Sequence, residues 1–455
     1  MSVSGENQNE VGVIGLDITG RNVSFRLAEQ RFKVAAYDWA GQGTKVLREQ
    51  STEPALRLAT SVSELMANLR QPRTILLFSG PDAPMNSILD RLLPELKSGD
   101  LVIDAGASYF KDTATLKHRL AERCVQFMGI GLLGGEKGAR HGAVVMAGGV
   151  REARGQARPL LEAMSASVRG GTCLSWFESA AAAHFVKMVH GGIECALMQL
   201  LSETVDLLQR ILRLTDKELQ VVSGLWRQGV LDGHLIELSG HASWMLLREK
   251  VESVRSDASG RRLAQSSWEM EVPIPTIEAA LEIQRVAANE RRQALVAALF
   301  RHPVGRFGED RDSVLDGLYR AFQAATMITY AQGLALLNAA STQLGFQFNL
   351  HEISRAWRGG TQLRAVMLED ISTALEMTPD LPGLLSDDEF SERVMACQEK
   401  LRHAVWRAQE LGTAAPALFA SLDYLDSNRA AWMPVNLIQV PRLKPVAPAA
   451  SYSYY

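Results

Sequence analysis

Three ionisable residues at helical spacing give this sequence its clearest chemical signal. Lys187, His190 and Glu194 lie in a stretch without proline that has apolar residues at helical intervals. Because a helix has 3.6 residues per turn, the three share one face with Gly191. Burial lowers the pKa of a lysine and raises that of a glutamate, so Lys187 and Glu194 could act as a base and an acid near neutral pH. The alternative is that they are buried charges satisfied by their neighbours and kept for packing alone.

The pattern of secondary structure changes near residue 178. Before it, six short β-rich runs alternate with helix-length segments, which predicts βαβ units and a largely parallel sheet. The runs are Val11–Gly15, Lys33–Tyr37, Thr74–Phe78, Leu101–Asp104, Val125–Gly129 and Gly142–Ala147. After it, long segments carry periodic apolar positions without strand signals, which predicts helices packed on one another. These segments include Ala181–Leu212, Thr276–Phe300 and Leu315–Gly345.

These patterns predict three parts in the chain. We expect an α/β Rossmann-type domain over residues 10–178 and an all-helical domain over residues 179–433. Residues 434–455 contain Pro434, Pro441, Pro445 and Pro448, which prevent a regular helix and predict an extended tail.

The composition is that of a multi-domain protein without a strong electrostatic bias. The chain has 455 residues, with 48 Lys and Arg against 51 Asp and Glu, a formal net charge of -3. This balance gives no reason to expect nucleic acid or an anionic membrane as a partner. The four cysteines are scattered without a CxxC spacing, so we expect neither disulfides nor a metal site. The polar N-terminus does not read as a signal peptide and no apolar run could span a bilayer, so we expect a cytoplasmic protein.

The first βα unit contains an altered dinucleotide-binding motif. Gly15 and Gly20 stand at the first and third glycine positions of a G-x-G-x-x-G pattern, but Asp17 stands at the middle one. Backbone N–H groups at this turn normally approach a pyrophosphate, so a carboxylate there adds bulk and like-charge repulsion. Asp38, at the end of the second strand, stands where an acidic residue can accept the ribose hydroxyls of NAD and repel the 2′-phosphate of NADP. The alternative is that the glycines serve only the turn and close packing, and that Asp38 is a turn residue beside Trp39.

The segment from His184 to Glu194 resembles the catalytic helix of the 6-phosphogluconate dehydrogenase family, whose pattern is roughly HFVKMVHNGIEY. The resemblance extends from about Val11 to Arg442. It implies a homodimer that carries out NADP-dependent oxidative decarboxylation of 6-phosphogluconate, a sugar-acid phosphate, to ribulose 5-phosphate in the pentose phosphate pathway. In that family the lysine takes the substrate hydroxyl proton, and the glutamate donates a proton after carbon dioxide leaves. The resemblance therefore implies these roles for Lys187 and Glu194, with His190 beside them.

The same resemblance implies positions for the other ligand contacts. The implied cofactor-binding residues are Gly15, Gly20 and Asp38. The implied substrate-binding residues are Gly134, Gly135, Glu136, Arg262 and, from the tail of the partner subunit, Arg442. A phosphate-binding arginine of the family falls near Glu282, Gln284 or Arg285, depending on the register.

Several ligand-facing positions depart from the family pattern while scaffold positions match it. The family has Asn where this chain has Ala107, Ser where it has Leu133, Thr where it has Ala264 and Ala where it has Asp17. It also has Arg in place of Trp39, Asn in place of Gly191, Tyr in place of Cys195 and His in place of Pro448. Alanine and leucine side chains have no hydrogen-bonding groups, so the replaced contacts cannot be made. We therefore expect ordinary 6-phosphogluconate dehydrogenase activity to be lost or altered, and NAD to be preferred over NADP where either binds. Two alternatives remain: an NAD-preferring oxidoreductase of another hydroxy acid, and a non-catalytic homodimer with a binding, regulatory or assembly role.

Overall fold

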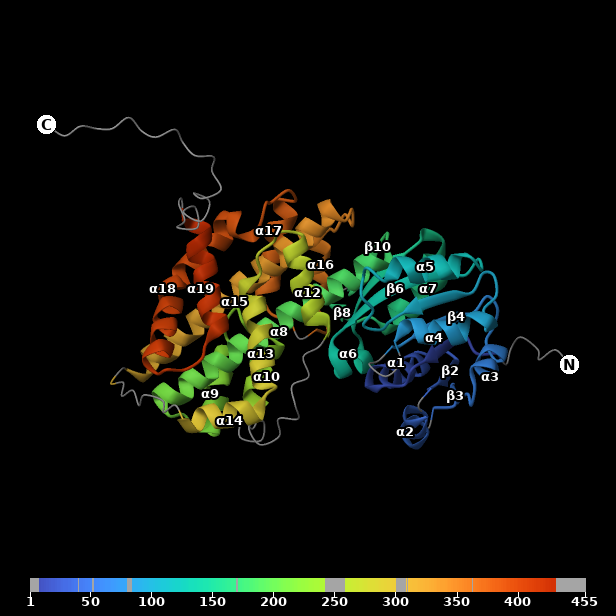
Figure 1. The fold of residues 1–455 in the computed structure, drawn as a ribbon, viewed down its shortest axis with the longest axis horizontal. Helices are drawn as coiled ribbons and strands as arrows, with labels where there is room; N and C mark the ends of the chain where they lie inside the picture. Colours follow the sequence, from blue (N-terminus) through green and yellow to red (C-terminus); the bar gives the residue numbers. More distant parts are fainter. Residues whose placement is uncertain are drawn as a thin grey trace, which may run out of the picture.

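The chain folds into a half that contains a sheet and a half that is helical, which lie end to end in Figure 1. The computed structural model describes residues 8–430 except 40, 51–52, 80–83, 169–170, 242–257, 300–307, 309 and 362. The predicted tail, including Arg442, lies outside the described residues. Within them, no helix is both long enough and apolar enough to cross a membrane.

An eight-stranded sheet forms the first half, in the order β10-β7-β6-β5-β4-β1-β2-β3. Its strands are β1 (Val11–Ile14), β2 (Val34–Tyr37), β3 (Leu56–Leu58), β4 (Thr74–Leu77), β5 (Leu101–Asp104), β6 (Gln126–Leu133), β7 (Val144–Gly149) and β10 (Leu174–Phe177). Neighbouring strands are parallel except β6 and β7, which are antiparallel. This confirms the predicted, largely parallel sheet. The edge strands β3 and β10 were not among the predicted runs.

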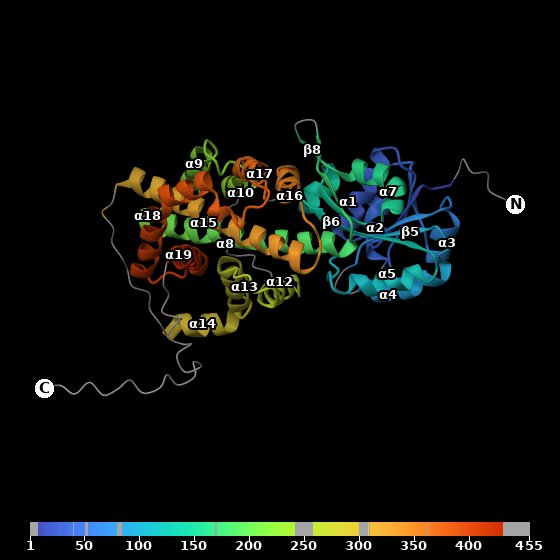
Figure 2. The same ribbon diagram turned by 90° about the horizontal axis from the view of Figure 1, so that it is seen from above.

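Helices cover both faces of this sheet. They are α1 (Ile18–Glu29), α2 (Gln42–Gln50), α3 (Val62–Ala67), α4 (Met85–Leu92) with the 3-10 turn η2 (Leu93–Glu95), α5 (Thr113–Ala121), α6 (Gly135–His141) and α7 (Arg151–Met164); a small hairpin pairs β8 (Ser167–Val168) with β9 (Gly171–Thr172). Figure 2 shows α4 and α5 on one face and α1 and α7 on the other. Two buried apolar clusters match this arrangement, one with side chains of α1 and α7 and the other with side chains of α3, α4 and α5.

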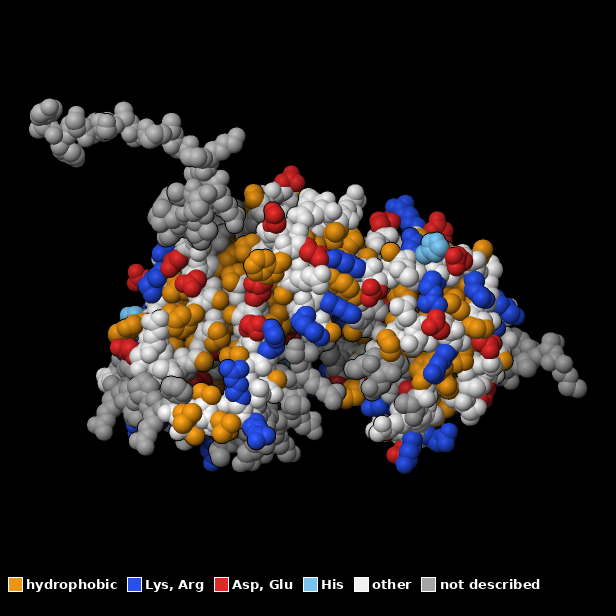
Figure 3. Space-filling model, in the orientation of Figure 1, with side chains coloured by type: hydrophobic (Ala, Val, Ile, Leu, Met, Phe, Trp, Pro, Cys, Tyr) orange, Lys and Arg blue, Asp and Glu red, His pale blue; other side chains and the backbone are white. Residues whose placement is uncertain are grey.

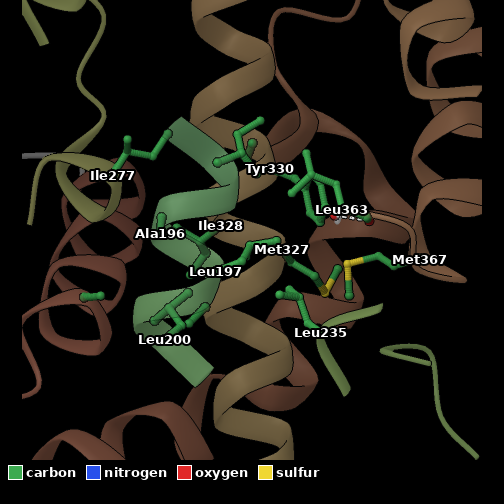
Figure 4. Packing of buried hydrophobic residues seen from close by; sticks show 14 of the residues in the cluster. Ala196, Leu197, Leu200, Leu235, Ile277, Met327, Ile328, Tyr330, Leu363 and Met367 are labelled. Atoms are coloured by element: carbon green, nitrogen blue, oxygen red, sulfur yellow. Dashed lines mark hydrogen bonds between the residues drawn. The ribbon is translucent and has the colours of Figure 1, made fainter. Parts of the chain in front are cut away.

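Two 33-residue helices form the centre of the second half. They are α8 (Ala180–Leu212) and α15 (Arg311–Gln343), and the other elements are α9 (Asp216–Trp226), α10 (His234–His241), α12 (Ala258–Glu269), α13 (Pro275–Ala287), α14 (Glu290–Leu299), α16 (Leu350–Trp357), α17 (Met367–Met377), η3 (Leu384–Ser386), α18 (Asp388–Glu410) and α19 (Pro416–Arg429). Figure 4 shows Leu197 and Leu200 of α8 packed beside Ile328 of α15. The helices approach closely because residue 333 is a glycine: an added Cβ there would lie 2.4 Å from Ile193 Cδ1. The all-helical pattern of this half is confirmed.

One predicted helical segment is divided in the structure. The apolar pattern over Thr276–Phe300 suggested a continuous segment, but α13 ends at Ala287 and α14 begins at Glu290. The side chain of Asn289 accepts the N–H of Arg292 at 3.1 Å and starts the second helix. The side-chain cap therefore sets a boundary that apolar periodicity does not show. Phe300 lies outside the described residues.

Candidate functional site

The first turns of α8 lie against the sheet because glycines line the facing strand. An added Cβ at Gly131 of β6 would lie 3.0 Å from the Cβ of Lys187. The helix starts at a side-chain cap, in which the Ser179 hydroxyl accepts the N–H of Ala181 at 3.2 Å. The fold thus brings the N-terminal half of α8 to the carboxyl ends of β5 and β6, where ligands of open α/β sheets bind.

Lys187, His190, Gly191 and Glu194 all line one cavity of about 320 Å³. The one-sided arrangement predicted from their spacing is therefore present on α8. The opposite wall comes from the loop after β5 and the end of β6, which supply Ala107, Ser108, Tyr109 and Leu133. The cavity thus lies between the sheet and the helical half.

Lys187 is held against the loop that follows β5. Its Nζ donates to the Gly106 carbonyl oxygen at 2.8 Å and lies 3.5 Å from the Ala105 carbonyl oxygen. Gly106 is itself fixed, because its N–H donates to Asp104 Oδ1 at 2.9 Å. The Lys187 ammonium is therefore positioned at the cavity wall by backbone of the other half of the chain.

The two other ionisable residues of this helix face are shifted towards neutral forms. Burial raises the pKa of Glu194 to about 7. Burial, followed by the charge of Lys187, lowers the pKa of His190 to about 3. His190 Nδ1 lies 3.8 Å from a Glu194 carboxylate oxygen, and the imidazole ring packs edge-on against Trp357 at 5.4 Å. Near neutral pH the site therefore holds a neutral histidine beside a glutamate that is partly protonated.

Three buried polar atoms on the cavity wall have no hydrogen-bond partner among the described residues. They are His190 Nε2, Ser108 Oγ and Tyr109 Oη, and His190 is only 2% exposed. Leaving a buried polar atom unpaired costs about 1–3 kcal/mol. A polar ligand in the cavity would remove this cost.

A second histidine, His184, was not singled out from the sequence. It is buried one turn before Lys187, with Nε2 3.3 Å from the Asp104 carbonyl oxygen. Its Nδ1 lies 3.2 Å from the Thr113 hydroxyl. These contacts place His184 as a link between α8 and the sheet, which only the tertiary structure could reveal.

The predicted substrate-binding residues are only partly brought together. Gly134, Gly135 and Arg262 line the cavity. The Arg262 guanidinium stacks over the Tyr109 ring at 4.8 Å. Glu136 is exposed on α6 and is not part of the cavity wall, while Arg442 lies outside the described residues.

The predicted nucleotide turn forms, but a carboxylate occupies its helix end. Gly15 has φ +92°, and an added Cβ at Gly20 would lie 2.0 Å from the Gly15 carbonyl oxygen, so both glycines are required by close packing. Asp17 caps α1 by accepting the Gly20 N–H at 2.8 Å. The two glycines thus form the expected tight turn, and the Asp17 carboxylate partly neutralises the positive charge at the N-terminus of α1.

The end of β2 carries both an acidic residue and a nearby cation. Asp38 accepts the N–H of Leu16 at 3.2 Å and the N–H of Gly43 at 2.9 Å, so it also organises the turn. Trp39 packs edge-on against Tyr37 at 5.1 Å, and the Arg91 guanidinium of α4 lies 5.0 Å from its ring. Arg91 was not predicted, because it comes from a helix distant in sequence. It places a positive charge close to the position where the family arginine is replaced by tryptophan.

Comparisons with known proteins agree with this architecture. Residues 10–176 match the family model described as the NAD binding domain of 6-phosphogluconate dehydrogenase, and residues 183–442 match the model of its C-terminal domain. The NADP(+)-dependent, decarboxylating 6-phosphogluconate dehydrogenase of Bacillus subtilis is 32% identical over 96% of this chain and 95% of its own. The decarboxylating enzyme of Synechocystis is 33% identical over 95% of this chain and 92% of its own. The solved Plasmodium falciparum 6-phosphogluconate dehydrogenase superposes with a TM-score of 0.87 at 29% identity, over 95% of both chains.

Proposed function

The chain belongs to the 6-phosphogluconate dehydrogenase family, and we propose that it is an oxidoreductase whose ordinary 6-phosphogluconate activity is lost or strongly reduced. In this proposal Lys187 and Glu194 act on a different hydroxy acid. One observation carries the proposal: the cavity retains both proton-handling side chains, while Ala107 and Leu133 form its opposite wall.

The proposed proton transfers follow from the positions of Lys187 and Glu194, which lie at opposite ends of the helix face that lines the cavity. In its neutral amine form Lys187, held by the Gly106 carbonyl oxygen, takes the proton of the substrate hydroxyl as that carbon is oxidised. When the oxidised acid loses its carboxylate as carbon dioxide, Glu194, with a pKa raised to about 7, donates its proton to the carbon that carried the carboxylate. An acid with a pKa near the working pH is well suited to this role, because both protonation states are populated.

Two cavity residues argue against 6-phosphogluconate as the substrate. Leu133 is 5% exposed and belongs to the apolar core, so it offers no hydrogen bond to a sugar-acid hydroxyl. Ala107 likewise replaces an amide with a methyl group. An apolar wall facing a substrate hydroxyl rejects that substrate by about a hundredfold. The family substrate would therefore bind and react poorly.

For the cofactor, we propose NAD in preference to NADP, with weak binding of either. The Gly15 turn and the Asp38 carboxylate would hold the nucleotide, and a bound nicotinamide would accept the hydride from the substrate carbon. Asp17 opposes the pyrophosphate through its negative charge at the α1 terminus. Arg91 is a cation near this end of β2 that would favour a 2′-phosphate, so its removal is an informative variant.

We also propose that the chain is a homodimer, as the resemblance implies. Large apolar side chains are exposed on α13 and α14: Val286 is 54%, Leu295 63% and Leu299 78% exposed. Figure 3 shows hydrophobic side chains gathered over the part of the surface where α14 lies. Contiguous exposed apolar surface is typical of a protein interface. Sedimentation at micromolar concentration tests this, and a monomer would contradict it.

The test of the enzymatic proposal combines binding and turnover. Calorimetric titration with NAD and NADP is followed by assays of reduced-nucleotide formation with 6-phosphogluconate and a panel of other aldonic and short hydroxy acids. We expect weak NAD binding, turnover of a non-phosphorylated hydroxy acid, and loss of that turnover in Lys187→Met and Glu194→Gln. Efficient NADP-linked turnover of 6-phosphogluconate would overturn the proposal.

A non-catalytic role is the second candidate, and the Asp17 cap favours it. The Asp17 carboxylate already accepts a backbone N–H at the N-terminus of α1, so fewer N–H groups and less positive charge remain there to bind a cofactor phosphate. No binding of either nucleotide at millimolar concentration, in a folded dimer, would favour this candidate over the enzyme.

A further inference from the structure

A second and larger cavity adjoins the first along α8. It has a volume of about 450 Å³, and it shares Met188, Gly191 and Ser259 with the cavity that contains Lys187 and Glu194. The two cavities therefore meet at the point where Gly191 interrupts the side chains of the helix face. We call the second cavity the side lobe.

Gly191 leaves this junction open without being required by packing. An added Cβ at Gly191 would meet nothing within 4 Å, whereas one at Gly192 would lie 2.1 Å from Leu263 Cδ2. Gly192 is thus needed for α12 to approach α8, but Gly191 is not. A glycine inside a helix is less stable than alanine by about 1 kcal/mol. Packing against neighbouring residues does not explain why position 191 is a glycine.

The walls of the side lobe are largely apolar. Leu263 and Leu281 are buried or partly buried apolar side chains from α12 and α13, and Met188 comes from α8. Cys195 lies one helical turn beyond Gly191, and its Sγ accepts a hydrogen bond from Gln284 Nε2 at 3.1 Å. Burial raises the pKa of the Cys195 thiol to about 11, so this pair is uncharged near neutral pH.

The charged groups of the side lobe balance one another. Arg261 and Arg285 are matched by Glu278 and Glu282 on its wall. Arg285 is paired with Glu282 at 2.6 Å, and Glu278 accepts the indole N–H of Trp268 at 3.0 Å. A dianionic phosphate would gain little here, because it would have to compete with carboxylates already in place.

We propose that the two cavities form one substrate site, in which the side lobe takes an uncharged and largely apolar substituent of the hydroxy acid. This rests on the proposed function, because the polar cavity is assigned to the reacting hydroxyl and carboxylate. Gly191 and Cys195 are then specificity-determining residues. Their small side chains open the lobe, and restoring bulk at either position closes it.

Binding of three defined compounds tests the proposal without requiring turnover. The compounds are gluconate, 6-phosphogluconate and 6-O-benzylgluconate, which share the acid end and differ in the group at C6. Calorimetry on the full-length protein is expected to show at least tenfold tighter binding of the benzyl compound than of gluconate. No gain from the phosphate is expected. Equal binding of the benzyl compound and gluconate, tightest binding of 6-phosphogluconate, or no binding of any compound would overturn the proposal.

Two variants locate the effect in the side lobe. Cys195→Tyr fills the lobe and Gly191→Asn fills the junction, so each is expected to bring the ratio of benzyl-compound affinity to gluconate affinity down to about one. Met198→Tyr is the matched control, since Met198 is 40% exposed on the same helix and does not line the lobe. A benzyl preference that survives in both folded variants, or that is lost equally in the control, would overturn the proposal.

The binding result is separable from the enzymatic proposal. Benzyl-selective binding without oxidation of any hydroxy acid would leave the side lobe standing and contradict the proposed function. Oxidation of gluconate without selective binding of the benzyl compound would support the proposed function and contradict the side lobe.

Discussion

The carboxylate of Asp17 accepts the backbone N–H of Gly20 at 2.8 Å and caps α1 at the turn where the family motif places a pyrophosphate. We expect the same side chain to stabilise the helix and to oppose an anionic ligand. These two effects can be separated, because asparagine can cap a helix without carrying a charge.

We predict that Asp17→Asn and Asp17→Ala both strengthen dinucleotide binding by roughly five- to tenfold. The reason is that a like charge about 4 Å away costs about 1 kcal/mol in water-like surroundings. Only Asp17→Ala should also lower the free energy of unfolding, by about 1 kcal/mol, because the cap is lost. Calorimetry with NAD and urea unfolding measure the two effects. Unchanged affinity in both variants would show that Asp17 does not face the nucleotide.

We predict that 6-phosphogluconate turnover by the unmodified chain is absent or very low. The contacts replaced at Ala107 and Leu133 each cost about 1.5–3 kcal/mol where the bond is to a charged or reacting group, and each ~1.4 kcal/mol is a factor of ten in rate. Ala107→Asn and Leu133→Ser together should raise any trace activity more than either change alone. A double variant no more active than the single ones would show that other contacts are limiting.

We predict a pH-dependent contribution of Glu194 to stability. Its pKa is raised from 4.5 to about 7 by burial, so the folded state binds a proton more tightly than the unfolded chain. This contribution is fully present below about pH 4.5 and is lost as the pH rises through about 7. The free energy of unfolding of the unmodified protein should therefore contain a decrease of about 1–3 kcal/mol over this window that is absent in Glu194→Gln, since one pKa unit is about 1.4 kcal/mol.

The measurement is urea unfolding of both proteins between pH 5 and 8. His190 acts with the opposite sign, because its lowered pKa makes the folded state lose stability in acid. The difference between wild type and Glu194→Gln isolates the glutamate. A pH-independent difference would contradict the raised pKa.

We predict opposite stability effects for alanine at two adjacent glycines. Gly191→Ala should stabilise the protein by about 1 kcal/mol, because the added methyl group meets open space and alanine favours the helix. Gly192→Ala should destabilise it, because the methyl group would overlap Leu263. Thermal unfolding of both variants tests this, and a destabilising Gly191→Ala would show that the junction is already filled.

The sequence by itself predicted those features that depend on neighbouring residues. Short β-rich runs separated by helix-length segments located β1, β2 and β4 to β7, and apolar periodicity located α8 and α15, because both signals lie within single elements. The spacing of Lys187, His190 and Glu194 placed them on one side of α8 for the same reason. The edge strands β3 and β10 were missed, and so was the Asn289 cap, which does not alter the apolar periodicity.

The tertiary structure decided which distant residues meet. Lys187 is held by the Gly106 carbonyl oxygen, Arg91 stacks on Trp39, and Gln284 rather than an arginine reaches Cys195. The sequence left the register near residues 282–285 open, because the pitch of α13 fixes only which residues share a face. Which of them contacts α8 depends on how α12 and α13 pack against it, and that packing is set by close contacts such as the one at Gly192. Local periodicity thus determined the elements, and packing between elements determined the shape and charge of the site.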